Sequence, residues 1–141
     1  GDVPPRLGTA IGLAAGGDEL FTLYEDGHTS HCLASNATGE LECQDPYLFQ
    51  DGRQGVPALD FTDLRFSRLS YSPPPDPSIY FLEPTKAELY QFSLRLNLNR
   101  ILRASGGSAL LPSRPVTAFS VSANRVVFLA YENALYSAVL P

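Results

Sequence analysis

The sequence predicts an all-β domain of three antiparallel four-stranded units, the last of them incomplete. Residues 78–95 carry the clearest signal, because an apolar, aromatic-rich run is followed by a turn at residues 83–86 and then by alternating apolar and polar residues. The same hairpin pattern recurs at residues 18–33 and 125–140. No window shows sustained helical periodicity, and 12 prolines and 11 glycines among 141 residues suit short strands joined by turns.

The three units cover residues 8–45, 60–105 and 115–141. We expect strands at residues 9–15, 20–24, 28–33 and 40–44 in the first unit, at 61–71, 78–82, 89–94 and 98–104 in the second, and at 115–122 in the third, where two further strands reach residue 140. Glycine and proline at the intervening positions mark the turns.

Residues 45–60 form a loop-rich connection between the first two units. Tyr47, Leu48 and Phe49 lie within it, and we expect them to plug a gap in the core rather than to form a strand.

The spacing of the units is typical of propeller blades. The aromatic positions Phe21, Phe81 and Phe128 look equivalent and are 60 and 47 residues apart, and repeats of roughly 40–50 residues with four strands each are typical of propellers. The first strand of a unit is small and apolar, the second and third are the most hydrophobic, and the fourth is polar. That gradient fits a blade whose first strand crowds the central axis.

The second unit resembles known propeller families. The resemblance is to blades of the six-bladed NHL, gluconolactonase-like and yellow/royal-jelly groups. It is carried by Tyr71-Ser-Pro, residues 79–81, Leu89-Tyr90 and Leu94-Arg95. Residues 89–98 also resemble, less closely, a plexin or semaphorin blade. The resemblance implies a β-propeller over almost the whole chain.

Three blades do not close a ring, because propellers typically have four to eight. The missing blades could come from the rest of a longer protein of which this chain is a processed fragment, or from a second copy, which would make a homodimer. Alternatively, the units could curl into a small sandwich or barrel. We place the partner fragment ahead of the copy. Residues 1–7 are a further candidate for a missing outer strand, although Pro4 and Pro5 make them poor ladder donors.

Two features predict an oxidising compartment. Cys32 and Cys43 flank a strand–loop–strand and can pair across neighbouring strands, and Asn36-Ala37-Thr38 between them is an N-glycosylation acceptor. The alternative is a pair of free thiols beside a chance sequon. We expect a mature fragment of a secreted protein, with no apolar run long enough to span a membrane.

Acidic residues recur in the turn between the second and third strands of each unit: Glu25, Asp26, Glu83 and Glu132. A ring of carboxylates on one face of a propeller could bind Ca²⁺, as the resemblance to gluconolactonase-like proteins also implies. The plainer interpretation, which we prefer, is solvated turn residues. His28 and His31, on opposite faces of a strand, could form a zinc site with Cys32 only if Cys32 is not in a disulfide.

The charge balance argues against two classes of binding partner, and the absence of known catalytic motifs bears on an enzymatic function. A net charge of −5 and a pI near 4.8 argue against binding to nucleic acid or anionic lipid. No serine-nucleophile elbow, phosphate loop or zinc-protease motif is present. The sequence therefore favours an extracellular protein-binding propeller module over an enzyme. The alternative is part of a six-bladed metal-dependent hydrolase or lactonase.

Overall fold

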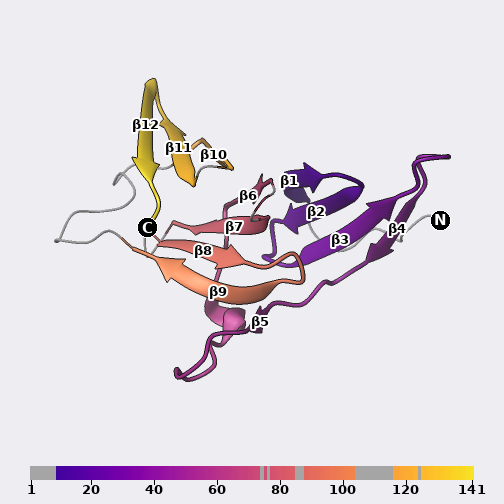
Figure 1. Ribbon diagram of the computed structural model, residues 1–141, viewed down its shortest axis with the longest axis horizontal. Coiled ribbons are helices and arrows are strands. Elements are labelled where there is room, and N and C mark those ends of the chain that lie inside the picture. The colour runs from indigo at the N-terminus through magenta and orange to yellow at the C-terminus, as the bar shows by residue number, and fades with distance from the viewer. Residues whose placement is uncertain (1–8, 74, 76, 85–87, 104–115, 124) are drawn as a thin grey trace.

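The computed structural model describes residues 9–73, 75, 77–84, 88–103, 116–123 and 125–141. Its strands form three sheets (Figure 1). Sheet A is a meander of β1 (Ala10–Gly16), β2 (Glu19–Tyr24), β3 (Thr29–Ala34) and β4 (Leu41–Gln44). Sheet B has the order β5-β9-β8-β7-β6, with β5 (Gln50–Asp51), β6 (Arg68–Ser72), β7 (Ser78–Glu83), β8 (Glu88–Phe92) and β9 (Asn97–Leu102). Sheet C contains β10 (Ala118–Val121), β11 (Val126–Tyr131) and β12 (Ala134–Val139).

The predicted all-β class and the three antiparallel units are confirmed. The hairpin at residues 78–95 is β7 paired with β8, with Phe81 opposite Tyr90. Some predictions fall outside the described residues: the outer strand at residues 1–7, residues 85 and 86 of the turn at 83–86, and the loop at 105–114.

The predicted strand at residues 61–71 is wrong over its first half. Phe61–Asp63 is a 3₁₀ helix (η1), and β6 begins only at Arg68. The cause is local, because the Asp60 carboxylate accepts hydrogen bonds from the backbone N and the Oγ1 of Thr62 and so caps a turn in place of a strand.

The connection between sheets A and B adds a strand that the sequence did not predict. Gln50 and Asp51 pair in parallel with the outer edge of β9, opposite Asn97 and Leu98. Asp51 then holds the loop that follows, because its carboxylate accepts hydrogen bonds from Arg53 and from the backbone N of Leu59.

The first strands of the three sheets lie together, and the sheets fan out from them (Figure 1). β6 contacts β1 on one side and β10 on the other. At the first contact β1 has glycine where β6 has large side chains: a Cβ on Gly12 would lie 2.5 Å from Leu69 Cδ2, and a Cβ on Gly16 would overlap the Tyr71 ring. The small residues of β1 therefore allow close approach of the two sheets.

Hydroxyl groups join β6 to β10. The backbone N of Val121 donates to Ser70 Oγ at 3.0 Å, and Ser72 Oγ donates to the carbonyl of Ser122 at 3.1 Å. Because Ser70 and Ser72 are both buried, these bonds satisfy polar groups that would otherwise be costly.

Two apolar cores fill the spaces between the sheets. The core between sheets A and B includes Phe21, Leu23, Ile79 and Phe81, all fully buried. Phe49 of the connection packs into this core, and its ring lies 5.1–5.5 Å from the rings of four other phenylalanines: Phe61, Phe66, Phe81 and Phe92. The prediction that this segment fills a gap in the core is thus confirmed for Phe49 and the partly buried Tyr47, but it is wrong for Leu48, which is 67% exposed.

The core between sheets B and C contains Tyr80, Leu82, Leu89, Leu102, Val121, Val127, Leu129 and Leu140. The two cores lie on opposite faces of sheet B, which is therefore covered on both sides. Sheets A and C each have one face that points away from sheet B, and we call these the free faces.

Candidate functional site

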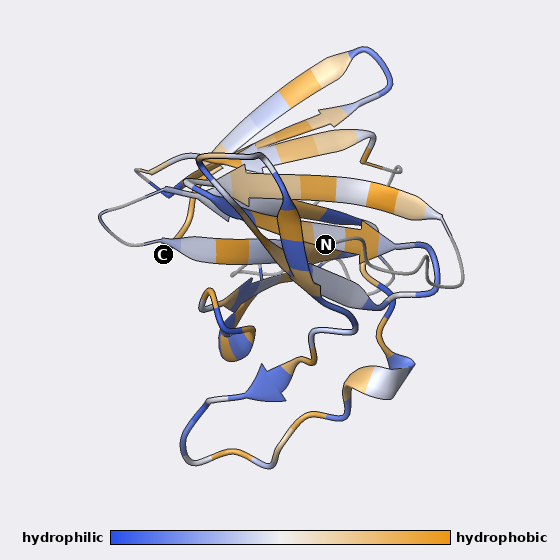
Figure 2. Ribbon diagram, turned by 90° about the vertical axis from the view of Figure 1, so that its right-hand side faces the viewer, coloured by the Kyte–Doolittle hydropathy of each residue, from blue (hydrophilic) through white to orange (hydrophobic). Residues whose placement is uncertain are grey.

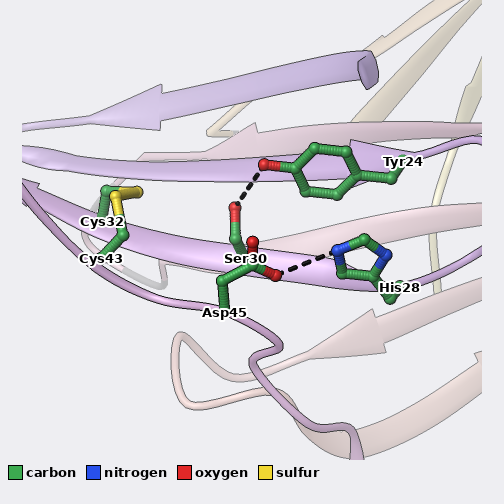
Figure 3. The surroundings of a disulfide bond; sticks show 6 residues. All are labelled: Tyr24, His28, Ser30, Cys32, Cys43 and Asp45. Atoms are coloured by element: carbon green, nitrogen blue, oxygen red, sulfur yellow. Dashed lines mark hydrogen bonds and ion pairs between the residues drawn. A yellow bond between two sulfur atoms is a disulfide. The ribbon is translucent and has the colours of Figure 1, made fainter. Parts of the chain in front are cut away.

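The predicted disulfide between Cys32 and Cys43 is confirmed. The two residues are directly opposite each other on β3 and β4, with their Cα atoms 4.0 Å apart (Figure 3). Phe21 and its cross-strand partner His31 lie on the face of sheet A that points to sheet B, so Cys32 is on the free face. Because both thiols are in the disulfide, Cys32 cannot be a zinc ligand, and the zinc hypothesis is excluded.

Asn36 lies in the exposed turn between β3 and β4. Ser35 Oγ accepts hydrogen bonds from the backbone N of Ala37 and of Thr38, which shape this turn. The sequon is therefore presented to solvent, and its glycosylation stays a prediction.

The four acidic residues predicted as a metal ring do not form one shared cluster. Glu83 is not a solvated turn residue: it ends β7, is buried, and is opposite Glu88 of β8. Glu25 and Glu132 are exposed, and Asp26 is bonded to His28. Across the described ranges no three histidine, cysteine, aspartate or glutamate side chains are placed to hold a metal ion.

His28 lies just before β3, not on it as predicted, and joins two segments of chain. Its ring stacks on Tyr24 at 4.3 Å, Nδ1 is 2.5 Å from Asp26 Oδ1, and Nε2 is 3.0 Å from Asp45 Oδ1 (Figure 3). The hydrogen bond from the backbone N of His28, with the ring contact, lowers the pKa of Asp26. Sequence reasoning missed Asp45, because nothing in its surroundings marks it as a partner of His28.

His31 makes a second contact to the same connection. On the inner face of β3, Nε2 lies 2.9 Å from Glu19 Oε1, and the ring stacks on Tyr47 at 4.8 Å. Both histidines thus hold the start of the connection against sheet A, which is a structural role.

A groove of about 600 Å³ follows this connection at the junction of sheets A and B. Its lining residues come from three segments, at residues 26–29, 46–49 and 59–65. Thr29 Oγ1 borders it, buried and without a hydrogen-bond partner among the residues that the structure describes. The groove has an apolar lining with aspartate, histidine and arginine among its residues.

The free faces of sheets A and C are the most distinctive surfaces. On sheet C, Phe128, Leu135 and Val139 are 48%, 84% and 76% exposed, and a shallow apolar groove of about 260 Å³ crosses the sheet beside them. On sheet A, Leu13 is 66% exposed and Leu41 is 39% exposed. Figure 2 shows hydrophobic and more hydrophilic bands alternating along the strands.

Neither free face carries a charged side chain on its strands. From the strand pairing, the free face of sheet A presents the exposed Ala10, Leu13, Ala15 and Leu41, the half-buried Leu20, Tyr24, Ala34 and Cys43, and the buried Thr22, Ser30 and Cys32, with the exposed Ile11 at a bulge of β1. The free face of sheet C presents Ala118, Ser120, Val126, Phe128, Ala130, Leu135, Ser137 and Val139. Exposed apolar patches of this kind are typical of interfaces.

One aromatic position differs from the prediction. Phe128 is not equivalent to the buried Phe21 and Phe81, because it points to the free face of sheet C. Tyr136 of the same sheet is 53% exposed.

No protein-family model matches this chain, and a search of curated proteins found no match. None of the helical structure in the described ranges is long and apolar enough to cross a membrane.

Proposed function

We propose that the three sheets are blades of a β-propeller that works outside the cell by binding protein, and that further blades cover its two free faces. The observation that carries the proposal is the arrangement of β1, β6 and β10. These first strands lie side by side while the outer strands point away from them (Figure 1). Such a fan is the expected arrangement of successive blades around an axis.

The free faces support the binding role. Monomeric proteins rarely expose large contiguous apolar patches, and depletion of charge is typical of the buried centre of a protein interface. Leu135 and Val139 on one face, and Leu13 on the other, would each move out of water when covered.

The disulfide supports the extracellular location. Disulfides persist in oxidising compartments and are rare in the cytosol. The exposed turn that carries Asn36 is compatible with glycosylation during secretion. The alternative function as a metal-dependent hydrolase has no specific support, because the acidic residues predicted to bind its metal do not converge in the described part of the chain.

The test is carbene footprinting of the protein isolated from its natural source under native conditions, compared with the 141-residue chain produced alone and kept dilute. We expect Leu13, Phe128 and Leu135 to be labelled strongly in the dilute chain and protected in the native assembly. The intact mass then shows whether the covering blades belong to the same polypeptide. Equal labelling of all three residues in both samples would overturn the proposal.

A further inference from the structure

We propose that the free face of sheet C is shaped to receive the free face of sheet A of a second copy, so that two chains close a ring of six sheets. This inference rests on the proposed function and names the partner. Each free face is expected to bind one partner, the other free face of a second copy, because the order of small and large side chains on the first strands determines which faces fit together.

At the contact between sheets A and B, the strand that comes first in the chain has small residues and the later strand has large ones. On the B-facing side β1 has Gly12, Ala14 and Gly16, and β6 fills the space above the glycines with Leu69 and Tyr71. The earlier sheet in the chain therefore supplies the hollow and the later sheet the projection.

The contact between sheets B and C repeats this order. The side chains of β6 that point to sheet C are the small, buried Ser70 and Ser72, preceded by Arg68, which donates to the carbonyl of Thr117 at the edge of sheet C. Across from them β10 supplies the larger Phe119 and Val121, which pack into the second core. In the middle of β6, the side chains are thus large towards the preceding sheet, at Leu69 and Tyr71, and small towards the following one, at Ser70 and Ser72.

The free faces continue the same order. On its free face β10 has only Ala118 and Ser120, which are small and exposed. On its free face β1 has the exposed Leu13 at its centre, with Ile11 at the bulge and the smaller Ala10 and Ala15 on either side. Sheet A of a second copy would therefore follow sheet C as sheet C follows sheet B, with Leu13 projecting over the small residues of β10.

Charge and geometry agree with this pairing. The strands bring no charged side chain onto either face, and the carboxylates beside the free face of sheet A, Asp26 and Asp45, are each paired with His28. Each junction is heterologous, and a head-to-tail contact makes a closed ring only if the rotation closes. Two copies of three sheets give six, inside the usual range of four to eight blades, whereas three copies would give nine.

The experiment uses two charge variants of the full 141-residue chain, Leu13→Glu on sheet A and Phe128→Lys on sheet C. Light scattering should give the unaltered chain a mass of about twice 15.3 kDa. Each variant alone should be monomeric, with dimer dissociation constants raised at least about 100-fold, because each buries an unpaired charge at both junctions. Leu48→Glu, at an exposed apolar residue of the connection, is the control and should leave the dimer intact.

Mixing the two variants is the decisive step. A mixed dimer has one unaltered junction and one junction at which the introduced carboxylate on β1 faces the introduced ammonium group on β11, so mixing should restore the dimer. A dimer that pairs like faces would respond to only one variant and would not recover on mixing, and that result would overturn the proposal. A monomeric unaltered chain would also overturn it, whereas the footprinting of the native assembly would still decide the proposed function. Circular dichroism of each variant confirms that its strands are retained.

Discussion

The disulfide between Cys32 and Cys43 should contribute about 3 kcal/mol to the free energy of unfolding. The two cysteines are 11 residues apart in sequence. For a closed loop of that length, the chain-entropy relation removes roughly 9 cal/mol/K from the unfolded state, which is about 2.8 kcal/mol at 25 °C. The folded state loses little on reduction, because the ladder between β3 and β4 pairs residues on both sides of the bridge.

The expected change in melting temperature follows from the chain length. Globular proteins unfold with an entropy of roughly 2.1 cal/mol/K per residue near 60 °C, so for 141 residues about 2.8 kcal/mol corresponds to about 9 °C. Thermal unfolding by circular dichroism with and without reductant measures the shift. The double variant Cys32→Ala, Cys43→Ala should unfold near the reduced protein and should not respond to reductant.

A shift below about 2 °C, with complete reduction verified by thiol labelling, would refute the reasoning. It would mean that the reduced, unfolded chain keeps the two cysteines close, so that the bridge constrains nothing further.

Three other changes test the packing between the sheets. Gly16→Ala places a methyl group in the Tyr71 ring and should destabilise the fold by about 1–3 kcal/mol. The double variant Gly16→Ala, Tyr71→Ala should lose less stability than the sum of the losses in the two single variants. Additive losses would contradict the contact between Gly16 and Tyr71. Asp51→Asn should lower the free energy of unfolding by about 2–3 kcal/mol at pH 7. The hydrogen bond from Arg53 holds the pKa of the Asp51 carboxyl far below its usual value. The stability difference between Asp51→Asn and the unaltered protein should therefore shrink as the pH falls below about 4, where the carboxyl of the unfolded state takes up a proton. Urea unfolding at pH 7 and pH 3 measures this, and a constant difference would rule it out. Phe49→Ala should cost about 2–4 kcal/mol, against less than about 0.5 kcal/mol for the exposed neighbour Leu48→Ala; equal effects would show that Phe49 is not a core residue.

The strands were predictable where their side chains alternate and a turn separates them. Residues 78–95 read correctly as a hairpin for that reason, and Cys32 and Cys43 were predicted to pair because a short turn between two strands can place them opposite each other. Local periodicity of this kind is a property of short windows of sequence.

Other features depend on contacts that a short window does not contain. β5 has two residues and takes its partner, β9, from nearly 50 positions further along the chain. The sequence pattern predicted that a strand begins at Phe61, but the Asp60 side chain caps a turn there. The outward direction of Phe128 was hidden because β11 has apolar residues on both of its faces, so the pattern does not tell which face is covered.

The position of β12 has a consequence for how the chain behaves during synthesis. Within the described strands β12 ends sheet C, and its six residues, Ala134 to Val139, include no charge and no proline. Uncharged edge strands of this kind are templates for lateral strand addition, which has no closing geometry and leads to aggregates. The substitution Ser137→Lys at this edge should therefore lower the tendency of the newly made chain to aggregate.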